Sequence, residues 1–238
     1  MKLVKIGIAF LLAVACFSGV HAQTADEIIN KYIDAIGGKD KLDQVKTVYI
    51  ESTSQAMGNE GPMTSSLVNG KGFRMDTEMN GQKITQVLTD NGGWQVNPYM
   101  GAVAPQALPD EAYKQSKGQL YFAGPLYNYA AKGNKVEFVG KDGNAFKLKV
   151  TSVDSVETMT YIDATTYYLT KISRSVEFMG QATDLTITYS DFKKADLGIV
   201  MPYSSEINYG GQFSITNTVK KIEFNKTIDP SIFVMPKS

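Results

Sequence analysis

Cysteine and histidine are almost missing from this chain of 238 residues, which holds one of each, Cys16 and His21. Both lie in an opening segment that starts with two lysines, continues as a short apolar run and ends in small residues. A charged start, a short apolar core and a small-x-small processing site are typical of a secretory signal peptide. We therefore expect residues 1–22 to be a signal peptide, with Gln23 as the first mature residue.

This segment has two other interpretations. The apolar run is too short to cross a hydrocarbon layer of ~30 Å as a helix, which argues against a retained anchor. The residues from Ala13 to Cys16 could instead form a lipobox, in which case Cys16 would carry a lipid. Because Ala13 stands where leucine is usual, cleavage after Ala22 is the favoured interpretation.

Loss of the leader leaves a mature chain without a thiol or an imidazole. This excludes disulfides, cysteine nucleophiles, Ser-His and Cys-His dyads and histidine metal ligands. It also removes the commonest general base near neutral pH. Carboxylate or lysine chemistry stays open, but the sequence favours a protein that is not an enzyme and has no cofactor and no metal.

A strong charge of either sign is also lacking. Without Lys2 and Lys5 the 24 basic residues become 22, against 24 acidic residues, a net charge of −2. Such a balance, with no basic cluster beyond two neighbouring lysines, gives no reason to expect a nucleic-acid partner. No later stretch is apolar enough to span a membrane. The length suits a single domain over residues 23–238, and we expect a monomer.

The chain then shows one helical pattern followed by strands. Thr24 and Glu27 form a capping box ahead of isoleucines at helical spacing. From Thr47 onward the apolar period changes to two, and short turn signals such as Asn80-Gly81 separate the runs. These features predict a mainly β protein of the α+β class, with roughly ten antiparallel strands joined by hairpins. Residues 105–133, rich in proline and aromatics, are predicted to be a helical insertion that crosses the sheet.

Several segments together resemble a known family. They are DEIINKYIDAIGGKDKL near the start, VLTDNGGWQVNP, GKDGNAFKLKV, TYIDATTYYLTKI, YSDFKKADLGIVMPYSSEI and, at the end, NKTIDPSIFVMP. In this order they are similar to the outer membrane lipoprotein-sorting carriers, the LolA/LolB-like group. The resemblance implies a strongly curved antiparallel half-barrel whose concave face is covered by an N-terminal helix and the helical insertion. It also implies a cavity for acyl chains. Arg74 lies near the position of an arginine that gates the cavity in family carriers, but its polar-face position argues against that role here.

The candidate site follows from this half-barrel. We expect its concave face to bind hydrocarbon under a lid from the insertion, where methionine suits a variable guest. For each residue, ordinary core packing is the competing interpretation. The predicted cavity residues are Phe73, Met75, Met79, Trp94, Leu120, Phe122, Phe146, Leu148 and Arg174.

Arg174 is unusual because it shares its side of a predicted strand with the apolar residues Ile172 and Val176. It could anchor a lipid head group or acyl carbonyl at the cavity mouth. Alternatively, its stem could extend past apolar neighbours at a sheet edge, or a bulge could reverse the pattern. Asp163 and Asp191 follow strands, where aspartate commonly stabilises turns, so no catalytic carboxylate is predicted.

These observations favour a carrier of acyl chains that is exported across the inner membrane and is either free in the periplasm or associated with the outer membrane. Its cargo would be the acyl chain of a lipoprotein or of another lipid, exchanged with an envelope protein as donor or acceptor. The second hypothesis is an envelope lipid sensor or protein-interaction module that uses the same cavity. The sequence alone does not separate the two.

Overall fold

The computed structural model describes residues 24–178 and 180–236. The predicted signal peptide, the start at Gln23 and the alternative lipidation of Cys16 lie outside the described residues. Within them, none of the helices is long and apolar enough to cross a membrane.

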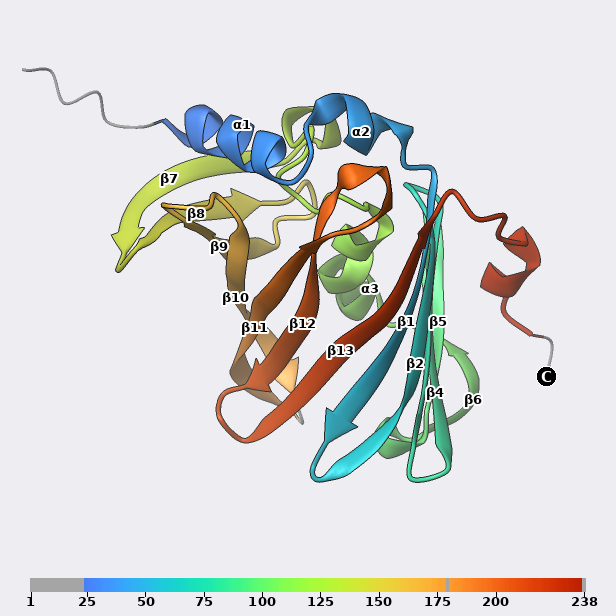
Figure 1. Ribbon diagram of the computed structural model, residues 1–238. Coiled ribbons are helices and arrows are strands. Elements are labelled where there is room, and N and C mark those ends of the chain that lie inside the picture. Colours follow the sequence, from blue (N-terminus) through green and yellow to red (C-terminus); the bar gives the residue numbers. More distant parts are fainter. Residues whose placement is uncertain (1–23, 179, 237–238) are drawn as a thin grey trace, which may run out of the picture.

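Thirteen antiparallel strands of the described chain form one open, strongly curved sheet (Figure 1). Their order is β6-β5-β4-β3-β2-β1-β13-β12-β11-β10-β9-β8-β7. The first group comprises β1 (Thr47–Ala56), β2 (Asn59–Val68), β3 (Gly72–Met79), β4 (Gln82–Thr89), β5 (Gly92–Asn97) and β6 (Ala102–Ala107). The second comprises β7 (Lys135–Asp142), β8 (Ala145–Thr151), β9 (Glu157–Asp163), β10 (Leu169–Phe178), β11 (Gln181–Lys194), β12 (Val200–Tyr209) and β13 (Phe213–Phe224). The predicted mainly β half-barrel is confirmed.

The strand count exceeds the sequence-based estimate, and β6 shows one reason. Pro105 lies inside β6, within the interval that was predicted to be a helical insertion. Proline cannot donate to a sheet ladder and is therefore tolerated only where one side of a strand is unpaired. Because β6 is an edge strand, it accommodates Pro105, and the insertion begins later than predicted.

The first helix, α1 (Ala25–Ala35), forms as the capping box predicted. The Thr24 hydroxyl accepts from the Glu27 amide, and the Glu27 carboxylate accepts from the Thr24 amide. Gly37 and Gly38 have φ values of 136° and 87°, which glycine adopts without strain, and they separate α1 from α2 (Lys39–Gln44). Helix α1 buries Ile28, which is fully inaccessible, against the core.

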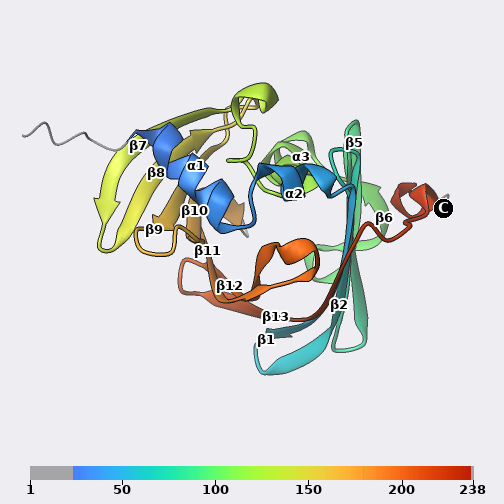
Figure 2. The same cartoon turned by 45° about the horizontal axis from the view of Figure 1, so that its top comes forward.

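The insertion runs from one edge of the sheet to the other, because it joins β6 to β7. It contains α3 (Asp110–Ser116) and the short 3-10 helices η2 (Lys117–Leu120) and η3 (Ala130–Lys132). Figures 1 and 2 show α3 inside the curve of the sheet, with α1 and α2 across one end of it. Leu120 and Leu126 are both 1% exposed, so the middle of the insertion is anchored in the core. The predicted helical cover of the concave face is confirmed.

The C-terminal segment packs against the outer face of β3, β4 and β5 (Figure 1). It includes η5 (Pro230–Phe233), whose Phe233 carbonyl accepts from the Trp94 indole nitrogen at 2.9 Å. Gly72 makes room for this segment, because a Cβ atom there would lie 2.9 Å from the Phe233 ring. The two faces of the sheet are therefore covered by different segments.

Two further 3-10 helices connect neighbouring strands: η4 (Asp196–Gly198) joins β11 to β12, and η1 (Pro98–Met100) joins β5 to β6.

Candidate functional site

The pairing of neighbouring strands shows which side chains share the concave face, because directly opposed residues point to the same side of a sheet. Phe73 of β3 lies opposite Leu67 and Leu88, and it packs against the main core. Met75 and Met79 follow at alternate positions on the same strand and so share this face. The three residues of β3 that were predicted to line a cavity therefore lie on the concave side.

Several of the predicted cavity residues are core residues in this structure. Leu148 is fully buried, Phe146 is 3% exposed and Leu120 is 1% exposed. Phe122 packs edge to face on Phe224, with ring centroids 5.4 Å apart. Phe146 and Leu148 belong to the core cluster that α1 and α2 share with the sheet, and Phe122 packs against it, so the chain's own side chains fill this end of the concave face.

The prediction that Trp94 faces inward is wrong. Trp94 lies opposite Val87, which lies opposite Arg74, so all three point to the outer face. There the Arg74 guanidinium lies over the Trp94 ring, with its Cζ atom 5.7 Å from the ring centroid, and Trp94 packs on Phe233. No local sequence pattern indicates that the C-terminal segment returns to cover this face, so alternation alone places a large apolar residue on the inner side.

Arg74 holds this outer packing together. Its guanidinium donates to both carboxylate oxygens of Asp76, at 2.6 and 2.9 Å, and to the Ile232 carbonyl at 2.7 Å. Burial opposes ionisation of Asp76, but the hydrogen bonds from Arg74 and Thr85 outweigh it and lower the pKa of Asp76. Arg74 is thus a structural residue on the side away from the concave face, as its polar-face position indicated.

A second part of the concave face is apolar but lies outside the core. Ile215, Ile207, Ile187 and Ile172 follow one another across β13, β12, β11 and β10, each directly opposite the next. All are partly exposed, and none belongs to the core cluster. Further apolar residues on the same face are also partly exposed: Met63, Met75, Met79, Tyr209 and Phe213. We call these residues and the four isoleucines the apolar strip.

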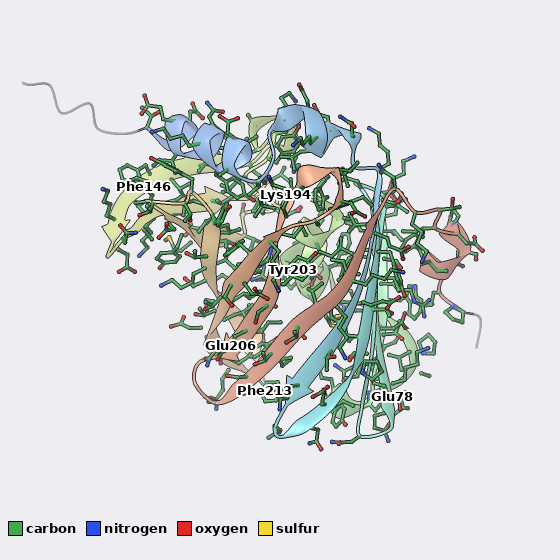
Figure 3. All side chains as sticks on the ribbon, in the orientation of Figure 1. Glu78, Phe146, Lys194, Tyr203, Glu206 and Phe213 are labelled. Atoms are coloured by element: carbon green, nitrogen blue, oxygen red, sulfur yellow. The ribbon has the colours of Figure 1, made fainter. Side chains whose placement is uncertain are left out.

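The apolar strip lies toward the end of the sheet where the β12–β13 hairpin turns. Figure 3 shows Phe213 near this hairpin and Phe146 at the end covered by helix α1. Both residues point to the same face through the strand pairing, so the concave surface has a filled end and a partly exposed end. The isoleucines were missed as site residues because the sequence shows alternation in each strand but not the register that aligns the strands.

Arg174 does share the concave face, as its position among apolar neighbours predicted. It lies directly opposite Leu185 of β11, whose other neighbour is Tyr209. Its guanidinium donates to the Gln115 carbonyl in the last turn of α3 at 2.5 Å. Burial lowers the pKa of Arg174. Burial likewise raises the pKa of the nearby Tyr189 to about 12, so that hydroxyl is neutral at physiological pH.

A pocket of about 830 Å³ opens beside Arg174. It is bounded by α3, by the loop between β8 and β9, and by the strands β9 to β11. Three of its four carboxylates are engaged by lysines: Glu111 with Lys114 at 2.8 Å, Asp154 with Lys117 at 3.1 Å and Glu157 with Lys149 at 3.5 Å. The pocket is mostly polar, and Lys171, Ser173 and Asp184 of its lining point to the outer face, whereas Arg174 borders it from the concave face.

A smaller pocket of about 200 Å³ lies between α2 and the insertion. Lys132 borders it, donates to the Gly124 carbonyl at 2.9 Å and sits 4.4 Å from the centre of the Tyr121 ring. Burial lowers the pKa of Lys132 to about 8. The Tyr127 hydroxyl donates to Asp43 on α2, so polar contacts tie the insertion to α2 at this point.

Of the two aspartates considered as catalytic candidates, Asp163 stabilises a turn as predicted, whereas Asp191 lies inside β11, at a position that the pairing with β12 skips. Asp163 accepts from the backbone amides of Thr165 and Thr166 at 3.0 and 2.7 Å, and these bonds lower its pKa. Asp191 lies at a φ of 53° and pairs with Lys193 at 2.7 Å. In the described part of the chain, no group of three or more His, Cys, Asp or Glu side chains is placed to hold a metal ion.

Comparison with solved structures identifies the class of fold. A LolA superfamily protein from Nitrosomonas europaea aligns with a TM-score of 0.55 at 12% identity, over 89% of this chain and 97% of that chain. A putative outer membrane lipoprotein-sorting protein domain from Vibrio parahaemolyticus gives 0.54 at 12% identity, over 87% and 94%. A DUF1329 family protein from Desulfovibrio piger gives 0.55 at 11% identity, over 88% and 96%. No protein-family model and no curated protein matches the sequence.

These likenesses define a LolA-like half-barrel, and the resemblance noted in the sequence is confirmed at the level of the fold. The alignments cover nearly the whole length of each of these structures.

Proposed function

We propose that this protein is an exported, non-enzymatic carrier of acyl chains, acting in the periplasm as a monomer. The apolar strip is the observation that carries the proposal. A row of isoleucines crosses four neighbouring strands without being part of the core, and soluble proteins seldom leave such a surface uncovered without a use for it. The likeness to a lipoprotein-sorting domain supports a lipoprotein acyl chain as cargo.

The dimensions of the strip suit hydrocarbon. Neighbouring strands lie ~4.8 Å apart, so the row from Ile172 to Ala56 of β1 extends about 19 Å across the sheet. Each methylene removed from water contributes about 0.8 kcal/mol, so a single long chain provides ample affinity. Tyr209 and Phe213 extend this surface, with ring centroids 6.0 Å apart.

Release of the cargo requires a cover that moves, and α3 fits this requirement. None of its residues is buried, whereas Leu120 and Leu126 anchor the rest of the insertion. Displacing α3 would therefore expose little apolar surface, and a small free-energy cost permits exchange with an envelope donor or acceptor protein.

The test compares two aspartates on β13. Ile215→Asp places a carboxylate in the apolar strip, and Thr218→Asp places the same charge on the outer face of the same strand. With a fluorescent fatty acid as reporter, we expect Ile215→Asp to weaken binding at least about tenfold, because a carboxylate in an apolar environment is costly to desolvate. Thr218→Asp should bind like the parent.

Circular dichroism establishes that both variants fold. Equal binding by folded Ile215→Asp and the parent would show that the strip is not the binding surface. Absence of fatty-acid binding by the parent would refute the carrier function itself.

A further inference from the structure

Arg174 is a buried cation for which the described chain provides no counterion. No carboxylate of the described residues pairs with it, and the electrostatic influences on its pKa come from burial and from Tyr209 and Tyr189. A terminal nitrogen donates to the Gln115 carbonyl, and the Nε atom is buried with no hydrogen-bond partner among the described residues. A guanidinium keeps its charge in proteins, so this arrangement is costly unless an anion completes it.

Other unsatisfied polar atoms surround the same point. The side-chain oxygen of Gln115 is buried without a partner beside the pocket of about 830 Å³. Rotation of that amide would present donors in place of the acceptor. Buried polar atoms normally have hydrogen-bond partners, so a pair of them at one pocket indicates a missing polar group.

The position of Arg174 relates this polar point to the apolar strip. Ile172 precedes it by two residues on the same face of β10, and Leu185 and Tyr209 lie across from it. A ligand whose polar group binds the Arg174 guanidinium can therefore place its hydrocarbon chain along the row of isoleucines. The carboxylates Glu157 and Asp184 of the pocket lie opposite Thr151 and Ser175 and belong to the outer face, so they do not compete for the guanidinium.

We propose that Arg174 binds the acid group of an anionic amphiphile, a carboxylate or a phosphate, whose hydrocarbon lies along the apolar strip. This inference rests on the proposed function, since it assigns the head group of the bound lipid. The planar guanidinium matches either acid group with two parallel hydrogen bonds. The ligand is thereby oriented. Its acid group lies at Arg174, beside the pocket that α3 borders, and its hydrocarbon chain extends toward the β12–β13 hairpin.

The experiment measures head-group preference by isothermal titration calorimetry at neutral pH. The ligands are decanoate, decyl phosphate, decanol and inorganic phosphate. We expect the parent to bind decanoate and decyl phosphate at least about tenfold more tightly than decanol, because charge-assisted hydrogen bonds form only with the acids. Inorganic phosphate should bind far more weakly than decyl phosphate.

Two variants locate the preference. Arg174→Met should weaken binding of the two acids to the level of decanol while leaving the affinity for decanol unchanged. Lys147→Met is the matched control, since Lys147 lies on the outer face of β8, opposite Tyr161, and does not border the pocket. It removes the same charge and should keep the preference. If Arg174→Met does not fold, Arg174→Gln replaces it, because a neutral amide can still donate to the Gln115 carbonyl.

The outcomes are distinct. Equal binding of decanoate and decanol by the parent would overturn the inference and leave the carrier function standing. A preference that survives in the Arg174 variant would overturn it as well. Inorganic phosphate that binds as tightly as decyl phosphate would show a free-anion site instead of a lipid site. Failure of every decyl ligand to bind would refute the proposed function.

Discussion

Arg74 and Arg174 show how two arginines on one sheet acquire different roles from their surroundings. Arg74 faces outward, has a carboxylate at 2.6 Å and fixes the C-terminal segment. Arg174 faces inward, has a backbone carbonyl as its partner and adjoins a pocket. The residue type is the same, and the presence or absence of a neighbouring anion separates a structural contact from a candidate binding contact.

The Arg74–Asp76 pair makes a prediction for stability. Asp76→Asn should lower the free energy of unfolding at pH 7 by about 1.5–3 kcal/mol, because hydrogen bonds to a charged group are lost. Since the folded pKa of Asp76 is lowered, its contribution is present above the unfolded pKa of about 3.9 and disappears as pH falls through the folded value. Urea unfolding should therefore show a smaller difference in the free energy of unfolding between the parent and Asp76→Asn at pH 3 than at pH 7.

The matched control for this prediction is Glu60→Gln, at an exposed position of β2. It should change the free energy of unfolding by no more than about 0.5 kcal/mol. A loss for Asp76→Asn that is the same at both pH values would contradict the assignment, because it would come from packing and not from the ionised carboxylate.

At the scale of elements, α1 and α3 differ in how they are held. Helix α1 buries Ile28, Ile29 and Tyr32, whereas α3 buries none of its side chains. Besides Arg174, the Tyr113 hydroxyl donates to the Thr89 carbonyl at 2.8 Å and fixes α3 to β4. A few polar contacts thus hold α3, and hydrophobic packing holds α1.

This difference predicts an order of hydrogen exchange. We expect the backbone amides of α3 to exchange faster than those of α1, because opening α3 exposes little apolar surface. Saturation with decanoate should slow exchange in α3 and leave α1 unchanged, which serves as the internal control. Mass spectrometry of peptic fragments measures both. Protection of α3 equal to that of α1, or unaffected by the ligand, would contradict its role as a movable cover.

The elements also show what the sequence could predict. The capping box at Thr24 and the alternation around Phe73 and Met75 are local signals, and they located α1 and β3 correctly. Three features depend on contacts distant in sequence: the inward row of isoleucines, the edge position of β6 and the cover over Trp94. Strand register and the return of the C-terminal segment have no local pattern, so these parts of the candidate site became visible only in the folded structure.

The whole molecule combines a filled end and a partly exposed end in one half-barrel (Figures 1 and 2). The core cluster joins α1, α2 and the sheet at one end, whereas the apolar strip at the other end lies outside this cluster. The central claim is that this uncovered end binds the acyl chain of a lipid.

Native mass spectrometry of the protein purified without detergent from the cell envelope tests that claim most directly. We expect a monomer carrying one lipid, which leaves on collisional activation, and a folded Ile215→Asp variant that carries none. Thr218→Asp, with its charge on the outer face, should retain the lipid. A parent protein free of lipid, even after incubation with envelope lipids, or an Ile215→Asp variant loaded like the parent, would contradict the account.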